Sequence, residues 1–434
     1  MRSKLPVLLL SCVLPLTAMT QTNPAKAQSK AKALTPAQVH QSALIIDTHA
    51  DTTGRLVDEN FDMANPPAGD EGHLDFAKAK KGNLAAEFFS IWVEPVEFKG
   101  RYAHRALAMI DAVYQQAEKH PDKMMMAFST ADIEKAYRQK KLAALMGLEG
   151  GHAIENNMRL LRMYYQLGVR YMTLTWSNTN EWADASGDIN DEKVKHHNGL
   201  TQFGREVVRE MNRLGMIVDI SHVSDRAFYH ALTTTRAPVI ASHSSARAIT
   251  DHGRNMTDDM LRAMRDNGGV VMVNFYSTFI DDDFRKAYTA AAKERNAALR
   301  ELKEQLKDKD PAVATAEYDK ASKEWANKIP RPPLKSLIDH IDHIAKVAGV
   351  DHVGLGSDFD GVNSLPAGID SAADLPKITE ELMKRGYTAA DMKKILGGNF
   401  MRVFKAVEAM SRQMKKEGEP MPLLPRKTDA AARK

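Results

Sequence analysis

Short apolar runs alternate with helical patterns along most of this chain. Eight runs of six to nine residues are each long enough for one buried strand. Between most of them, apolar and charged residues alternate at roughly helical spacing, as over residues 200–214. This order predicts an α/β fold, a (β/α)8 barrel of the TIM type. The runs are residues 44–51, 85–93, 142–149, 169–176, 216–222, 238–243, 269–276 and 352–358.

The carboxyl ends of these runs carry ionisable residues. His49 and Asp51 close the first run, Glu149 the third, and His222 and His243 the fifth and sixth. A barrel brings the carboxyl ends of its strands to one mouth, so we expect these side chains to converge. Imidazole and carboxylate groups together suit zinc and related divalent metals. A lone strand histidine is more often a hydrogen-bonded core residue, but the combined set favours a two-metal site.

The spacing also suggests how two ions would be shared. His49 and Asp51 are two residues apart on a strand, so their side chains point to one face and can meet one ion. Glu149 precedes two glycines, where the backbone can turn sharply, and its two oxygens can bridge two ions. His222 and His243 end adjacent strands in the similar contexts DISHVS and IASHSS.

Four further residues are candidates for roles around the metals. Asp358 closes the eighth run in GLGSDFDG, where a carboxylate facing the metals is suited to proton transfer, with Asp360 as the competing candidate. Arg254 follows the sixth run in HGRNMTDD and could clamp a substrate carboxylate, although an ordinary loop arginine would look the same. His152 could orient the site from outside the ligand set. The remaining histidines, in helical or loop patterns, are expected at the surface: His104, His120, His196, His197, His340 and His343.

The amino-terminal sequence indicates export. Two basic residues precede the apolar stretch 5–16, and Ala-Lys-Ala at 25–27 is a small-x-small cleavage site, so residues 1–27 form a predicted signal peptide. No segment approaches the roughly 20 apolar residues of a membrane span, so we expect no stable membrane insertion and a periplasmic or secreted protein. We expect no lipid anchor at Cys12, because the apolar run continues to Leu16. A formal charge of +4, with both signs interspersed, gives no reason to expect a nucleic-acid partner.

The 434 residues and 43% hydrophobic content suit one elaborated barrel. Residues 28–43 form a lead-in with room for one short helix, too short for the first half of a β-sandwich, so no separate β-sandwich domain is expected. The barrel occupies 44–410 and is followed by a basic tail at 411–434. After the seventh strand, the charged stretch 281–328 predicts a helical insertion interrupted near Pro311, which could cover the site, pair with another subunit or be a solvated appendage.

Several segments between about residues 44 and 408 resemble the renal or membrane dipeptidase family of zinc peptidases. The resemblance implies that His49 and Asp51 bind one zinc ion, that His222 and His243 bind a second, and that Glu149 bridges them. It also implies a small dipeptide substrate, a proton-transfer role for Asp358 and a substrate-carboxylate role for Arg254, and it suggests a homodimer. The matching segments are IIDTHAD, GLEGGHAIENN, RYMTLTWSNTNEWAD, GLTQFGREVVREMNRLGMIVDISHVS, IASHSSARAI, RNMTDDML, VMVNFY, HVGLGSDFDG and GGNFMRVF.

One family position differs in this chain. Where the family usually has a histidine, in a motif like LTHS, the sequence has Trp176. In the family that histidine helps stabilise the oxyanion, and removal of a single such donor costs about two to three powers of ten in rate. The indole NH donates from a different geometry and without charge. A different substrate class, a neighbouring donor such as Asn178 or Asn180, or a slow enzyme would explain the change, and the first two are favoured.

The leading hypothesis is an exported binuclear-zinc dipeptidase in which a metal-bridged hydroxide attacks the peptide carbonyl and Asp358 protonates the departing amine. The first alternative is an amidohydrolase acting on N-acyl amino acids or other small amides, which Trp176 makes plausible. The second alternative is a binding protein that holds peptides through its metals and Arg254 without turnover.

Overall fold

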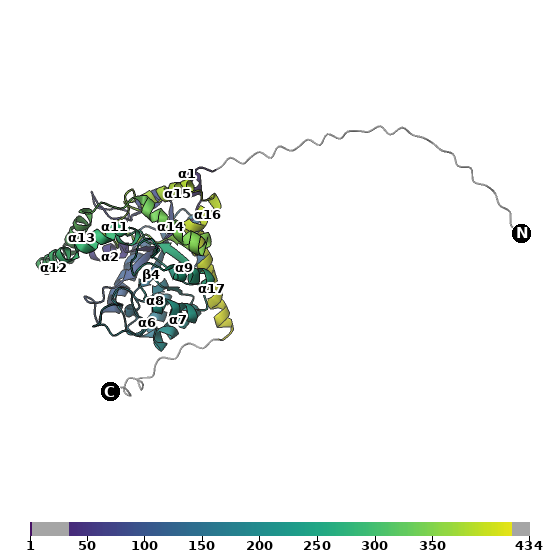
Figure 1. Ribbon diagram of the computed structural model, residues 1–434, viewed down its shortest axis with the longest axis horizontal. Coiled ribbons are helices and arrows are strands. Elements are labelled where there is room, and N and C mark those ends of the chain that lie inside the picture. The colour runs from purple at the N-terminus through teal and green to yellow at the C-terminus, as the bar shows by residue number, and fades with distance from the viewer. Residues whose placement is uncertain (2–33, 419–434) are drawn as a thin grey trace, which may run out of the picture. The chain divides into compact units, whose positions relative to one another are not determined.

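The computed structural model describes Met1 and residues 34–418. The predicted signal peptide, Cys12 and all but the start of the predicted basic tail lie outside the described residues. Residues 35–418 contain a nearly closed barrel of eight parallel strands, in the order β1-β2-β4-β5-β6-β7-β8-β9 (Figure 1). The first and last staves meet where Ala50 pairs in parallel with Phe359 and the Asp51 amide donates to the Phe359 carbonyl over 2.7 Å.

Each of the eight predicted runs contains one barrel strand, which confirms the predicted barrel. A ninth, short strand, β3, was not predicted; it pairs with the start of β4, so the seventh predicted strand is β8. The strands are β1 (Ile45–Ala50), β2 (Leu84–Trp92), β3 (Met124–Met126), β4 (Leu142–Glu149), β5 (Val169–Thr173), β6 (Ile217–Asp219), β7 (Ile240–Ala241), β8 (Val270–Val273) and β9 (Val353–Leu355).

Helices surround the strands and obey ordinary capping rules. In α7 (Gln202–Leu214), the Thr201 hydroxyl accepts the Gly204 amide at the amino end, and Gly215 ends the helix at a φ of +93°. The others are α1 (Pro36–Gln41), α2 (Thr52–Asp58), α3 (Phe76–Lys81), α4 (Tyr102–Lys119), α5 (Thr130–Arg138), α6 (Met158–Gln166), α8 (Asp225–Thr234), α9 (Asp258–Asn267), α10 (Ser277–Ile280), α11 (Asp282–Ala290), α12 (Ala292–Leu306), α13 (Pro311–Asn327), α14 (Leu334–Ala348), α15 (Leu375–Lys384), α16 (Ala389–Lys393) and α17 (Asn399–Lys416), with the short turns η1 (Gly151–Ile154), η2 (Val350–His352), η3 (Ala372–Asp374) and η4 (Lys394–Gly398).

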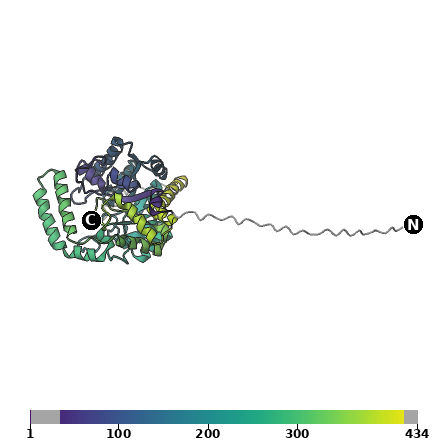
Figure 2. The same ribbon diagram turned by 90° about the horizontal axis from the view of Figure 1, so that it is seen from above.

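The stretch between β8 and α14 contains the short helix α10 and the longer helices α11, α12 and α13. The helical pattern breaks just before Pro311, which begins α13; proline suits this position because the first helical turn needs no amide donor there. Figure 2 shows α12 and α13 running side by side. The insertion reaches the loop after β9, where the Asn363 amide donates to the Ser322 hydroxyl over 2.9 Å, and α13 packs against α2.

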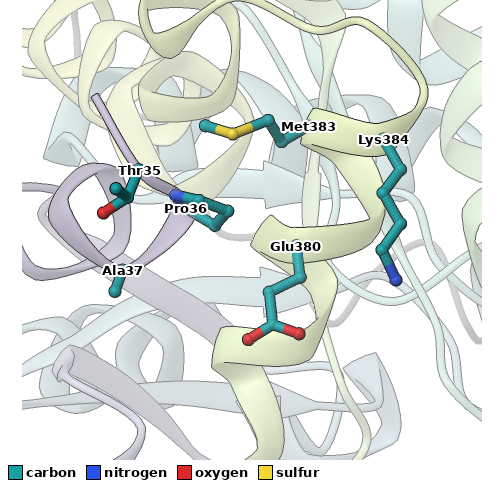
Figure 3. A pocket seen from close by; sticks show the side chains of 6 residues that line it. All are labelled: Thr35, Pro36, Ala37, Glu380, Met383 and Lys384. Carbon is teal, nitrogen blue, oxygen red and sulfur yellow. The ribbon is translucent and has the colours of Figure 1, made fainter. Parts of the chain in front are cut away.

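Helix α17 continues six residues past 410 and buries Ser411 and Met414, so the packed fold extends into the predicted tail. A surface hollow between α1 and α15 contains none of the candidate site residues (Figure 3); its lining is Thr35, Pro36, Ala37, Glu380, Met383 and Lys384. Within the described residues, no helix combines the length and apolar character that a bilayer span requires.

The expectation that the remaining histidines lie at the surface is wrong for two of them. His340 is fully buried in α14, and His120 is 9% exposed. Both have hydrogen-bond partners that compensate for the burial: the Ala246 amide donates to Nδ1 of His340 over 2.9 Å, and Nε2 of His120 lies 2.7 Å from an Asp62 oxygen.

Candidate metal centre

The five predicted metal ligands converge at the carboxyl ends of the strands. His49 lies in β1 and Glu149 is the last residue of β4, while Asp51 follows β1, His222 follows β6 and His243 follows β7. All are buried except Asp51, which is partly exposed. Residues as far apart in sequence as His49 and His243 therefore form one cluster, because parallel strands end on one face of the barrel.

Glu149 lies at the centre of the cluster, and its two oxygens face different histidines. Oε2 is 3.3 Å from Nε2 of His49, whereas Oε1 is 2.9 Å from Nε2 of His222 and 3.5 Å from Nε2 of His243. The Nε2 atom of His49 is also 3.4 Å from Oδ2 of Asp51. The geometry thus divides the donors into a His49 and Asp51 side and a His222 and His243 side, with Glu149 between them.

Hydrogen bonds behind two imidazoles determine which ring nitrogen carries the proton. The Tyr171 hydroxyl donates to the Thr48 carbonyl over 3.1 Å, so its oxygen accepts the proton of His49 Nδ1 over 2.8 Å. Likewise, the Ser242 hydroxyl donates to Asp219 and accepts the proton of His243 Nδ1, both over 2.7 Å. With Nδ1 protonated, each ring can bind a metal only through Nε2, which faces the cluster.

These supporting residues were missed by the sequence reasoning. Tyr171 lies within β5, and its ring crosses β4 at Gly147, where an added Cβ would lie 1.9 Å from the ring. Asp219 ends β6 and also accepts the Thr173 hydroxyl over 2.5 Å. The only sign of this contact in the sequence was a glycine, Gly147, on the strand next to that of Tyr171. It can be recognised only when the strand register is known.

The charge states of the cluster suit cation binding. Burial, with a contribution from Arg254, lowers the pKa of His222 to about 3, and burial likewise lowers the pKa of His243. Burial opposes ionisation of Glu149, but His49 and the other two imidazoles outweigh it and hold the pKa of that carboxyl well below its usual value. Burial opposes protonation of His49, but Tyr171, Glu149 and Asp51 outweigh it and raise the pKa of that imidazole well above its usual value. Buried imidazoles and carboxylates that compete for protons in this way fit a divalent metal, whose binding displaces the protons.

Asp358 lies beside the cluster on the loop after β9. Its Oδ1 is 4.0 Å from Nε2 of His49, and its Oδ2 accepts the Asn274 side-chain amide over 2.8 Å. Burial raises the pKa of Asp358 to about 7. Gly361 is required here, because an added Cβ would lie 2.1 Å from Oδ2 of Asp51 and 2.6 Å from Oδ1 of Asp358.

Asp360, the competing candidate for proton transfer, is occupied elsewhere. Its two oxygens accept the His73 amide over 2.6 Å and the Thr52 hydroxyl over 2.5 Å. It therefore ties the loop after β9 to the start of α2 and to the loop before α3. Asp358, Asp360 and His222 each adopt a left-handed backbone, with φ of +64°, +60° and +68°, a conformation that is costly for these residues and common at functional sites.

Arg254 is a buried cation that lacks a carboxylate partner within the described residues. Its terminal nitrogens donate to the Ser244 hydroxyl over 3.3 Å and to the His243 carbonyl over 3.2 Å, and its Nε has no partner there. Burial lowers the pKa of Arg254 to about 10, so the guanidinium stays charged near neutral pH. A buried guanidinium bound only to neutral groups is suited to an anionic ligand.

The candidates near Glu149 and β5 have different surroundings. His152 donates from Nε2 to the Val93 carbonyl over 2.8 Å, so its neutral ring presents a lone pair at Nδ1 rather than a proton. Asn180 holds its own loop, donating to Leu174 and accepting two backbone amides. Trp176 is partly exposed, and its ring centroid is 6.3 Å from that of His222.

An eight-stranded α/β barrel with imidazoles and carboxylates gathered at the carboxyl ends of its strands defines a metal-dependent hydrolase of the TIM-barrel class. Within that class, the model of the membrane dipeptidase family, peptidase family M19, matches residues 35–418. The chain therefore belongs to this family of metallopeptidases, and it is a metal-dependent dipeptidase by family.

Solved structures show the same fold. The probable dipeptidase PvdM from Pseudomonas aeruginosa is 26% identical, with a TM-score of 0.69 over 86% of this chain and 98% of that one. A metallopeptidase from Rhodobacter sphaeroides, liganded with a phosphinate mimic of the dipeptide L-Ala-D-Ala, is 24% identical, with a TM-score of 0.65 over 84% and 99%. An amidohydrolase from Pseudomonas aeruginosa is 22% identical, with a TM-score of 0.63 over 86% and 99%.

Proposed function

We propose that this protein is an exported binuclear-zinc dipeptidase that hydrolyses the peptide bond of dipeptides. The observation that carries the proposal is the position of Glu149, whose two oxygens face His49 on one side and His222 with His243 on the other. A carboxylate placed in this way can bridge two cations. Export rests on the sequence of residues 1–27.

The donors divide between two zinc ions. His49 and Asp51 would hold one ion and His222 and His243 the other, with Glu149 contributing an oxygen to each. Zinc bound at such a site supplies Lewis acidity and lowers the pKa of a bound water to about 7. The protonated Nδ1 atoms of His49 and His243, fixed by Tyr171 and Ser242, keep the Nε2 lone pairs directed at the metals.

The remaining residues would handle the proton and the substrate. Asp358 lies beside His49 and would accept a proton from the attacking water and pass it to the leaving amine. Asn274 holds one oxygen of Asp358 and leaves the other directed toward the cluster. Arg254 would bind the terminal carboxylate of the dipeptide. A dipeptide mimic with D-Ala at its carboxyl-terminal position is bound in the Rhodobacter sphaeroides metallopeptidase, so L,D dipeptides belong in the first substrate trials.

The neighbours of Trp176 differ in their capacity to donate a hydrogen bond to the oxyanion. His152 presents a lone pair rather than a proton, and Asn180 is occupied by its own loop. Asn178 remains the neighbouring amide that could donate to the oxyanion, through its side-chain nitrogen. If the metals alone stabilise the oxyanion, the enzyme will be slower than relatives that have a histidine at the position of Trp176.

The alternative substrate class is N-acyl amino acids. Such compounds keep both the amide bond and the carboxylate for Arg254, and they replace the amino-terminal residue by an acyl group. Trp176 favours this alternative, because an indole offers an apolar surface where the family usually has a histidine.

The test is the release of amino acids from L,L and L,D dipeptides by the purified protein, with its zinc content measured in the same preparation. Hydrolysis with about two zinc ions per chain is expected. One ion per chain would contradict the bridging role of Glu149. Turnover of N-acyl amino acids alone would establish the alternative substrate class, and dipeptide binding without release of amino acids would indicate a binding protein. The Glu149→Gln variant serves as the control, because it should bind less than two zinc ions.

A further inference from the structure

Two tryptophans lie beside Glu149 at the mouth of the barrel. Trp92 is the last residue of β2 and is in register with Glu149 on β4, so both side chains point to the same face of the sheet. Ser90, two residues earlier on β2, shares that face and donates to Glu149 over 3.0 Å. Trp176 follows β5, on the other side of β4. The two indole centroids are 5.1 Å apart.

The indole pair is open to a ligand on one side and adjoins the cluster on the other. Trp92 and Trp176 are both partly exposed, and the Trp176 ring lies at 34° to the His222 imidazole with centroids 6.3 Å apart. The indole nitrogen of Trp92 is buried without a hydrogen-bond partner in the described residues. Two large aromatic faces beside each other offer contact area to an apolar or aromatic ligand.

Strand order separates this pair from Arg254 around the mouth of the barrel. The barrel runs β2, β4, β5, β6, β7, so Trp92 at β2 lies four strands, and Trp176 after β5 two strands, from the strand that precedes Arg254. Arg254 donates to the carbonyl of His243, which follows β7, whereas Trp92 is in register with Glu149 on β4. A dipeptide whose carboxylate binds Arg254 and whose peptide bond lies at the cluster must extend its amino-terminal residue toward β2 and β5.

We propose that Trp92 and Trp176 form the subsite for the amino-terminal residue and select a large apolar or aromatic side chain there. The proposal rests on the proposed dipeptidase function and names its substrate class. Contact with two indoles favours a phenyl ring over a methyl group by about tenfold or more, the range measured when an apolar pocket discriminates among side chains of different size. The carboxyl-terminal residue has no contact with the indoles, so its side chain should be selected independently of them.

The test compares kcat/KM for Phe-Ala, Ala-Ala and Ala-Phe in the zinc-loaded wild-type protein and in the Trp92→Ala and Trp176→Ala variants. Trp325→Ala is the matched control, since Trp325 lies on α13, is not among the candidate site residues, and has the Lys328 ammonium over its ring. We expect a preference for Phe-Ala over Ala-Ala of about tenfold in the wild type, reduced to less than about threefold in each site variant and kept in the control. The ratio of Ala-Phe to Ala-Ala should stay constant.

Three results would overturn the proposal: no preference for Phe-Ala in the wild type, an equal loss on all three dipeptides, or a loss confined to Ala-Phe. If the wild type hydrolyses no dipeptide, the proposed function fails but the subsite is still tested. Dissociation constants of phosphinate mimics of Phe-Ala and Ala-Ala, measured by titration calorimetry on the zinc-loaded protein, must then show the same preference and the same loss in the two site variants. Equal affinities for the two mimics would reject the subsite.

Discussion

The Tyr171 hydroxyl lies 2.8 Å from Nδ1 of His49, and this contact determines the protonation of the histidine. Because the hydroxyl donates its own proton to the Thr48 carbonyl, it can only accept from the imidazole. The contact exists because Gly147 leaves room for the tyrosine ring to cross β4. Tyr171, on the fourth strand of the barrel, thereby fixes the position of the Nδ1 proton of His49, on the first.

Removal of this hydroxyl should weaken the metal site. In Tyr171→Phe the Nδ1 proton of His49 loses its acceptor, so the ring can rotate or adopt the other tautomer. We expect zinc affinity, measured by competition with a chelator, to fall about 10- to 100-fold. Tyr164→Phe is the matched control, because Tyr164 is equally buried and its hydroxyl donates to the Ala153 carbonyl, away from the metals. Equal losses in both variants would mean that the effect is general destabilisation.

Removal of the Ser242 hydroxyl, which links Asp219 to His243, should weaken binding of the second zinc ion. Ser242→Ala removes the acceptor for the Nδ1 proton of His243, and we expect one of the two zinc ions to bind about 10- to 100-fold more weakly. Ser242→Thr keeps a hydroxyl and should restore most of the affinity. If the alanine variant retains wild-type affinity for both ions, the hydrogen bond has no role in ligation.

The sequence allowed the barrel and the convergence of the five ligand candidates to be predicted, because both depend on local patterns. An apolar run of strand length and a polar residue at its end are visible without a register. Tyr171 and Ser242 were not predicted, because their roles arise from contacts between strands or from the direction of a single hydroxyl proton. Strand β3 was missed because three methionines carry no alternation of apolar and polar residues. His340 was misplaced because its partners, Ala246 and Ile280, are far away in sequence.

Comparison of two carboxylates tests the proton-transfer role. Asp358→Asn should leave about two zinc ions per chain, because Asp358 is not among the five proposed ligands, while kcat for dipeptides falls about 10²- to 10⁴-fold. Asp360→Asn is the matched control: it removes a carboxylate that binds the His73 amide and the Thr52 hydroxyl, so it should cost thermal stability more than it costs kcat. Full activity in Asp358→Asn would reject the assignment.

Burial of the neutral His340 imidazole should make the folded protein less stable in mild acid. The Ala246 amide donates to its Nδ1, and its Nε2 donates to the Ile280 carbonyl over 3.2 Å, so the folded state holds the neutral ring. Burial lowers the pKa of His340 from 6.5 to about 4. Above pH 6.5 the ring is neutral in both the folded and unfolded chain and contributes no pH dependence. Between about pH 6.5 and 4 only the unfolded chain takes up the proton, so the free energy of unfolding falls as the pH falls.

The size of this effect is on the order of 3 kcal/mol across that interval, at about 1.4 kcal/mol for each unit of pKa difference. The measurement is chemical denaturation from pH 8 to 4 in the presence of a chelator, so that zinc release does not contribute. His340→Asn should be less stable than the wild type at pH 8, and the gap should narrow as the pH falls, because the amide does not titrate. His104→Asn, at an exposed position on α4, should give a curve parallel to the wild type. A constant gap between the wild type and His340→Asn would show that the buried imidazole does not resist protonation.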